Sequence, residues 1–255
     1  MEQTARELLS MLDLTSLNDD DSEEDIWRLC QRTRTSAGPP AAVCVHRRLV
    51  AHAGACLVEL GLRHQVRVVT VANFPAGTSP VEEVLDEIRS ALTSGADEID
   101  LVFPYRALLA GDEDSGYRLI NRCRQVSTGQ VLKVILESGE LGSPERIRTA
   151  AEIALAAGAD FLKTSTGKTA VSATPEAAAV MLEAIAASGR PVGFKAAGGI
   201  RTVPQARAYL DLGRDLLGPT WLRPERFRFG ASSLLDDILS NLGLGARPVD
   251  LSSRY

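Results

Sequence analysis

The feature that most constrains the fold is a regular alternation of short apolar runs with longer helical stretches. The apolar runs predict seven strands, at residues 41–46, 66–74, 98–104, 132–138, 161–166, 192–198 and 227–232. An eighth, weaker strand is expected at 214–218, where the spacing between Lys195 and Gly230 would require it. The stretches between the strands, such as 79–95 and 174–189, begin at Ser or Thr followed by Pro and end at Gly, as capped helices do.

This alternation indicates parallel strands with helices covering both faces of the sheet. Eight such units in 255 residues favour a closed (β/α)8 TIM barrel. An open flavodoxin-like or Rossmann sheet is the alternative, although no GxGxxG follows the first strand. We expect one domain over 1–255, with an N-terminal helical extension at 1–38 and a mobile C-terminal tail at 246–255. The acidic run from Asp19 to Asp25 fits a helix start within the extension.

Composition excludes several classes of partner. The chain has 28 basic and 33 acidic residues, a net charge of −5, and no basic stripe that would bind nucleic acid. The first residues do not form a secretory signal, and no apolar run is long enough to span a bilayer. The four cysteines form no CxxC pair, which fits a reducing compartment, so we expect a cytoplasmic protein. Cys44 and His46 lack further ligands nearby, so we expect no metal and no cofactor.

The run FLKTSTGKT, residues 161–169, resembles the end of a nucleotide-binding P-loop. A P-loop also requires a glycine five positions before the Gly-Lys pair, and Leu162 stands there. The nucleotide interpretation therefore fails on spacing. The apolar pair Phe161 and Leu162 instead predicts a buried strand that runs into a turn.

An internal repeat connects two charged residues. When SGADEIDLV (94–102) is aligned with AGADFLKTS (157–165), Asp100 and Lys163 fall at the same offset in strands two units apart. Alternate barrel strands share an interior layer, so both side chains should point inward at the same height. A structural ion pair would explain them, but Lys195 adds a further charge that one carboxylate cannot neutralise. Lys133, also in a strand, either extends this set of cations or, taken alone, has a structural role.

This set of charges favours Schiff-base chemistry. A nearby ammonium lowers the pKa of a second lysine, which then attacks a carbonyl as a free amine. Lys163 is the better nucleophile candidate, and Lys195 is the ammonium that perturbs it.

Three turns rich in small residues follow strands and suggest a phosphate site. They are Gly167–Lys168, Gly198–Gly199 and the segment 230–233, which contains Gly230, Ser232 and Ser233. Lys168 would reach the phosphate as a point charge. Ser233 and Asp236 also stand at capping-box spacing at the start of a helix.

Taken together, the motifs resemble the deoxyribose-phosphate aldolase family over almost the whole chain. They are LDLTSLND near the start, DEIDLVFPYRAL, FLKTSTGK, GFKAAGGIRT, RFGASSLL and a terminal Tyr255. Two departures are Ala196, where a related branch has proline, and VCVHRR, where Tyr-Pro is more familiar after the cysteine. They bear on loop geometry and aldehyde preference.

The resemblance implies a metal-free, homodimeric enzyme that cleaves 2-deoxy-D-ribose 5-phosphate reversibly into acetaldehyde and D-glyceraldehyde 3-phosphate in deoxyribonucleotide catabolism. It implies that Lys163 forms the Schiff base and that Asp100 and Lys195 relay protons. Asp13 would contact a substrate hydroxyl or support the relay, and Tyr255 would swing in for proton abstraction. Alternatives are another Schiff-base sugar-phosphate aldolase, such as a transaldolase, and a non-catalytic sugar-phosphate sensor.

Overall fold

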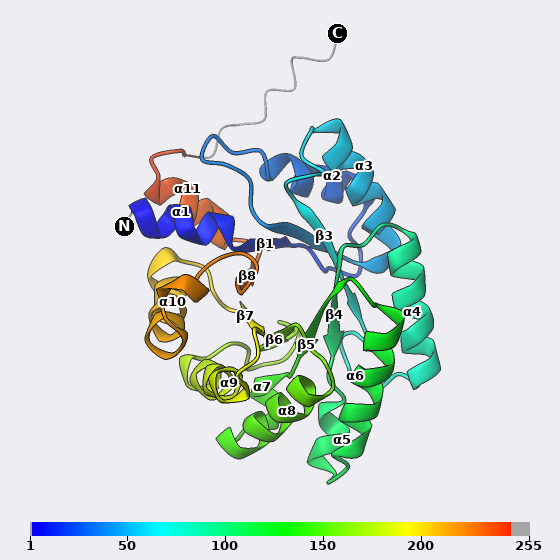
Figure 1. The fold of residues 1–255 in the computed structure, drawn as a ribbon. Helices are drawn as coiled ribbons and strands as arrows, with labels where there is room; N and C mark the ends of the chain where they lie inside the picture. Colours follow the sequence, from blue (N-terminus) through cyan, green and yellow to red (C-terminus); the bar gives the residue numbers. More distant parts are fainter. Residues whose placement is uncertain (1, 246–255) are drawn as a thin grey trace.

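Eight parallel strands close into a barrel in the computed structural model, which describes residues 2–245 (Figure 1). The strands are β1 (Leu12–Thr15), β2 (Ala42–Val45), β3 (Arg67–Ala72), β4 (Glu98–Val102), β5 (Val131–Ile135), β6 (Phe161–Lys163), β7 (Gly193–Ala197) and β8 (Phe227–Ala231). Each strand pairs with its sequence neighbours, and β1 pairs with β8. The predicted (β/α)8 barrel is therefore confirmed.

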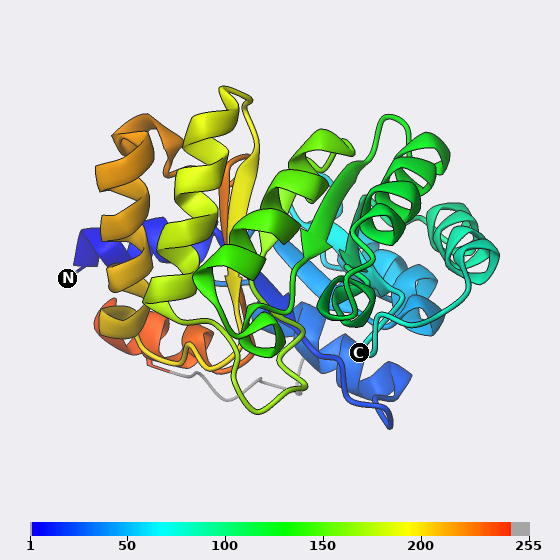
Figure 2. The same cartoon turned by 90° about the horizontal axis from the view of Figure 1, so that it is seen from below.

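Helices surround the ring of strands on its outer side (Figures 1 and 2). They are α1 (Glu2–Ser10), α2 (Glu23–Arg32), α3 (Val50–Glu59), α4 (Val81–Thr93), α5 (Tyr105–Leu109), α6 (Asp114–Val126), α7 (Ser138–Leu141), α8 (Pro144–Ala156), α9 (Pro175–Ser188), α10 (Val203–Leu217) and α11 (Leu234–Asn241), with 3-10 turns η1 (Arg47–Leu49) and η2 (Pro219–Trp221). The first and last helices, α1 and α11, lie side by side in both views and are in contact, which accompanies the closure of β1 onto β8.

One strand was predicted in the wrong place. Residues 214–218 form the end of α10 and the residue after it, and the missing strand is β1, inside the segment 1–38 that was expected to be helical. Helix α10 buries Ala206, Leu210 and Gly213 at helical spacing, so the run that follows continues a helix. Only four residues long, β1 was masked by the helical patterns on either side of it.

Two local predictions for the N-terminal segment have different outcomes. The acidic run does lead into a helix, because Ser22 caps α2 and forms a capping box with Asp25. The extension is only partly helical, since α1 and α2 are separated by the barrel strand β1. The predicted tail at 246–255 lies outside the described residues.

The barrel interior is divided into an apolar part and a charged part. Strands β2 and β3 contribute Ala42, Cys44, Val69 and Val71, which form a small cluster with Leu17, separate from the main core. The main core lies between the strands and the helices. The other strands contribute charged groups that are almost fully buried: Asp13, Glu98, Asp100, Lys133, Lys163, Lys195 and Arg228. Buried charges are costly unless they are paired, so each of these groups is expected to contact a group of opposite charge inside the barrel.

Within residues 2–245, no helix is both long and apolar enough to cross a membrane. The same part of the chain contains no group of three or more His, Cys, Asp or Glu side chains placed to hold a metal ion.

Candidate active site

Asp100 and Lys163 meet inside the barrel, as the internal repeat predicts. Asp100 lies in the middle of β4 and Lys163 is the last residue of β6. The Lys163 Nζ donates to Asp100 Oδ2 at 2.8 Å. Lys195 lies beside Lys163 in the register of β6 and β7, and its Nζ donates to the same Asp100 oxygen at 2.8 Å. One carboxylate oxygen therefore joins two lysines.

Further ion pairs extend this group in both directions. Lys195 Nζ also donates to Asp13 Oδ2 at 2.5 Å, and Arg228 Nη1 donates to Asp13 Oδ1 at 2.6 Å. Lys133 Nζ donates to Asp100 Oδ1 at 2.9 Å and lies 2.5 Å from Glu98 Oε2. Arg228 Nη2 closes the network with a 3.1 Å hydrogen bond to Glu98 Oε1. We call these groups the charge network.

The charge network contains one more cationic side chain than it has carboxylates. The cations are Lys133, Lys163, Lys195 and Arg228, and the carboxylates are Asp13, Glu98 and Asp100. If Lys163 is a neutral amine, three positive charges face three negative charges. Because uncompensated charge is costly in a buried site, the network favours loss of one proton.

The pKa shifts identify Lys163 as the group that gives up this proton. Burial lowers the pKa of Lys163, and although Asp100 opposes this, the Lys195 ammonium lowers it further. Burial would also lower the pKa of Lys195, but Asp100 and Asp13 raise it well above its ordinary value. The pKa of Lys133 is likewise raised, since Asp100 and Glu98 outweigh its burial. A low-pKa amine therefore stands beside lysines that keep their protons.

Two carboxylates in the network, Asp13 and Asp100, remain ionised. Burial alone would raise the pKa of Asp100, but Lys133, Lys163 and Lys195 together hold it well below its usual range. For Asp13, too, the effect of burial is outweighed, by Lys195 and Arg228, and its pKa is lowered. Both Asp13 oxygens are used in these contacts, so this residue supports Lys195 from below the cavity.

Sequence reasoning missed Glu98 and Arg228, whereas the alternative that Lys133 extends the set of cations is confirmed by its contact with Asp100. Glu98 precedes Asp100 by two positions, and Arg228 precedes Gly230 by two. Side chains two apart in a strand face the same way, so this period was the available signal. The single carboxylate expected beside the lysines is corrected to three.

A cavity of about 270 Å³ opens above Lys163. Its lining includes all of the residues predicted to form phosphate-binding turns: Gly167, Lys168, Gly198, Gly199, Gly230, Ser232 and Ser233. Residues after β1, such as Ser16 and Asn18, complete the wall. The three turns are thus brought together around the candidate amine.

Two of these glycines stand where a side chain would be crowded. Gly198 has a φ of +90°, and a Cβ there would lie 2.5 Å from the Ser172 Cβ. A Cβ on Gly230 would lie 3.0 Å from the Ala197 Cβ and 3.1 Å from the Lys195 Cε, so a side chain there would press on the lysine of the charge network. Gly198 is therefore needed for the turn, and Gly230 leaves room for the lysine beneath it.

The capping box predicted for Ser233 and Asp236 is wrong. Ser233 does precede α11, but its backbone is helical, with a ψ of −16°, and its side chain makes no capping hydrogen bond. A capping side chain normally requires an extended backbone. Asp236 pairs instead with Arg32 at 2.7 Å, and Ser233 lines the cavity.

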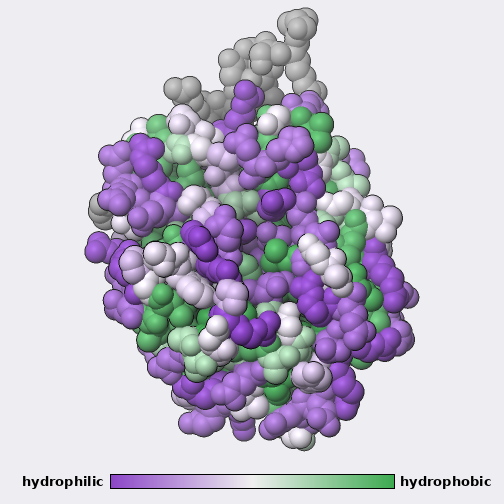
Figure 3. Space-filling view, viewed as in Figure 1, coloured by the Kyte–Doolittle hydropathy of each residue, from purple (hydrophilic) through white to green (hydrophobic). Residues whose placement is uncertain are grey.

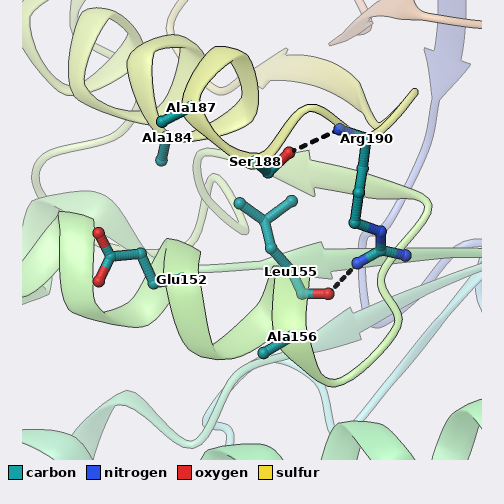
Figure 4. A pocket seen from close by; sticks show the side chains of 7 residues that line it. All are labelled: Glu152, Leu155, Ala156, Ala184, Ala187, Ser188 and Arg190. Atoms are coloured by element: carbon teal, nitrogen blue, oxygen red, sulfur yellow. Dashed lines mark hydrogen bonds between the residues drawn. The ribbon is translucent and has the colours of Figure 1, made fainter.

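A larger cavity, of about 520 Å³, lies between α8 and α9 (Figure 4). Its lining combines three alanines and Leu155 with Glu152, Ser188 and Arg190, and Arg190 donates to the Leu155 carbonyl. None of the predicted site residues lies there.

The face seen in Figure 3 is mostly hydrophilic, with hydrophobic residues scattered over it. Chemistry therefore favours the smaller cavity above the charge network. Tyr255 lies outside the described residues.

Comparison with known proteins finds similar chains over almost the whole length of this one. A structure from Toxoplasma gondii ME49, described as a candidate deoxyribose-phosphate aldolase, is 27% identical, with a TM-score of 0.88 over 97% of this chain and 98% of that chain. A candidate deoxyribose-phosphate aldolase from Coccidioides immitis is 27% identical, with a TM-score of 0.80 over 91% and 86%. The deoxyribose phosphate aldolase of Aeropyrum pernix, described as a unique tetramer, is 26% identical, with a TM-score of 0.75 over 95% and 96%. The model of the DeoC/LacD aldolase family matches residues 8–239, and the chain therefore belongs to the DeoC/LacD family of aldolases.

Proposed function

We propose that the protein is a class I aldolase that cleaves 2-deoxy-D-ribose 5-phosphate reversibly into acetaldehyde and D-glyceraldehyde 3-phosphate. Lys163 forms the Schiff base. The observation that carries this proposal is the lowered pKa of the Lys163 amine, which lines the cavity at the three turns. An amine that titrates nearer neutral pH is the nucleophile that such a reaction requires.

In the proposed reaction, the neutral Lys163 amine attacks the aldehyde carbon of the open-chain sugar, and loss of water gives an iminium ion. Removal of the proton from the C3 hydroxyl allows the C2–C3 bond to break, and its electron pair moves toward the iminium nitrogen. Glyceraldehyde 3-phosphate leaves and an enamine remains. Protonation at C2 and hydrolysis then release acetaldehyde and restore the amine.

Asp100 and Lys195 act as the proton relay in this scheme. Both lysines donate to the same Asp100 oxygen, so a proton has a short path between the two amines. The raised pKa of Lys195 supports its role as the proton reserve, and Asp13 holds it in place. Tyr255 is assigned to proton abstraction on the resemblance alone.

The phosphate of the substrate binds at the rim of the cavity. Backbone N–H groups at Gly167, Gly198, Gly199 and Gly230 and at the start of α11 suit an anion. Ser232 and Ser233 add hydroxyl groups, and Lys168 adds a positive charge.

The resemblance also supports a place in deoxyribonucleotide catabolism and a cytoplasmic homodimer that needs no cofactor. Sedimentation analysis distinguishes a dimer from the tetramer described for the Aeropyrum pernix protein.

The decisive experiment is reductive trapping. The protein is incubated with 2-deoxyribose 5-phosphate or acetaldehyde, reduced with borohydride, and the adduct is mapped by mass spectrometry. We expect the mass addition on Lys163 and none in Lys163→Arg. An adduct on Lys195 or Lys168 would overturn the assigned roles. Use of a ketone donor in place of acetaldehyde would indicate a transaldolase-like enzyme, and binding without an adduct would indicate a sensor.

A further inference from the structure

Glu137 is a buried carboxylate outside the charge network, and the reaction scheme does not use it. It follows the end of β5 by two residues and is 0% exposed. Its backbone is left-handed, with φ 57° and ψ 56°. A residue with a side chain adopts this conformation at a cost in free energy, so the surroundings must hold it there.

Within residues 2–245, all of the hydrogen bonds to the Glu137 carboxylate come from one turn, 166–169. The Thr166 backbone N–H donates to Oε1 and Oε2, at 3.2 and 3.3 Å, and the Thr166 hydroxyl donates to Oε2 at 2.5 Å. The Thr169 hydroxyl lies 3.3 Å from Oε1 and 3.1 Å from the Val171 carbonyl oxygen, so its single proton is shared between these two acceptors. Thr166, Gly167 and Lys168 line the cavity above Lys163, so the carboxylate supports the turn from behind.

Thr166 passes this constraint on to Lys168. The Lys168 backbone N–H donates to the Thr166 hydroxyl at 3.1 Å, while that hydroxyl donates to Glu137. The direction of the Lys168 backbone therefore depends on the rotamer of Thr166, which Glu137 fixes.

The chain that follows the turn packs closely against two glycines. A Cβ on Gly139 would lie 2.1 Å from the Val171 carbonyl oxygen, and one on Gly198 would lie 2.5 Å from the Ser172 Cβ. Val171 and Ser172 therefore lie close to these two glycines, and Glu137 contacts the turn at the beginning of the segment.

We propose that Glu137 is a positioning residue for the substrate phosphate, because it holds Gly167 and Lys168, through Thr166 and Thr169, in the geometry that receives the anion. This inference rests on the proposed function. The charge of Glu137 opposes a nearby phosphate, so its contribution is geometric. If Glu137 acted only through its charge, neutralising it would tighten phosphate binding. If Glu137 positions the turn, neutralising it should weaken phosphate binding.

The test compares Glu137→Gln with the wild type on 2-deoxyribose 5-phosphate and on unphosphorylated 2-deoxyribose. Gln places an amide donor where the carboxylate accepts several hydrogen bonds, so we expect KM for the phosphorylated sugar to rise about tenfold, the equivalent of one lost hydrogen bond to a charged group. We expect kcat/KM for 2-deoxyribose to change by less than about twofold, because that substrate does not use the turn. Glu140→Gln removes the same charge from an exposed position in α7 and serves as the matched control.

A second variant and a binding measurement keep the test independent of folding and turnover. Glu137→Asp retains the charge but withdraws the carboxylate by one methylene group, so it should also raise KM for the phosphorylated sugar. Circular dichroism checks the fold of each variant, and calorimetry with inorganic phosphate should show weaker binding in both. An unchanged or lowered KM in the folded variants, or an equal loss on both sugars, would overturn the inference. If the wild type does not prefer the phosphorylated sugar, the proposed phosphate site itself is wrong.

Discussion

Replacement of Lys195 by Met should raise the pKa of Lys163. Both lysine Nζ atoms lie 2.8 Å from Asp100 Oδ2, so they are at most about 5.6 Å apart. Two unit charges at that distance repel by about 3 kcal/mol at an effective dielectric constant of about 20, which corresponds to about two pKa units. Without Lys195, the three carboxylates of the charge network are balanced when Lys163 is protonated. This charge balance also raises the pKa of Lys163.

The pKa is measured from the rate of reductive trapping with acetaldehyde as a function of pH. The midpoint of the rising limb reports the fraction of neutral amine, and this limb should move up by about two units in Lys195→Met. At a pH below both midpoints, trapping should be about 100-fold slower. Acetaldehyde carries no phosphate, so this readout does not depend on the phosphate turns.

Lys168→Met is the control for the loss of a lysine near the site. Lys168 is exposed, so its charge is screened and its removal should move the midpoint by well under one unit. Loss of Lys195 leaves Asp13 with Arg228 as its remaining close partner, so circular dichroism must show that the variant is folded. An unchanged or lowered midpoint in folded Lys195→Met would refute the argument that Lys195 perturbs Lys163.

Two further predictions concern stability. Gly198→Ala should lower the free energy of unfolding in urea by about 2–4 kcal/mol, because its φ is +90° and its Cβ would meet Ser172. Gly199→Ala, with φ +81° and no atom within 4 Å of the added Cβ, should lower it by only about 1 kcal/mol. Equal losses in the two variants would show that the contact with Ser172 does not matter. The folded-state pKa of Asp13 is lowered from 3.8, so its stabilising contribution is complete above that pH and is lost as the pH falls toward the folded value. The urea midpoint should therefore decrease on acidification below about pH 4, and less steeply in a folded Asp13→Asn variant; parallel curves would count against this contribution.

Periodic features of the sequence predicted much of this structure. Seven strands, the barrel and the meeting of Asp100 with Lys163 follow from apolar patterning and from the period of a strand. The same period would have brought Glu98 into the charge network, had it been applied to residues two apart.

Features set by tertiary contacts were not predictable in this way. Strand β1 has four residues, and it is a strand because β2 and β8 flank it. The backbone of Ser233 is helical, which no spacing to Asp236 reveals. The support that Glu137 gives to Thr166 depends on two segments 29 positions apart in the chain.

The unequal numbers of cations and carboxylates in the charge network affect the relative stability of the intermediates in the proposed reaction. The resting enzyme is balanced when Lys163 is a neutral amine, but the iminium ion restores a fourth positive charge against three carboxylates. Breaking the C2–C3 bond sends an electron pair to that nitrogen and returns the network to balance in the enamine. The buried imbalance therefore opposes the intermediate that precedes bond cleavage and is relieved by the cleavage itself, so the same residues that free the amine also favour the step that follows.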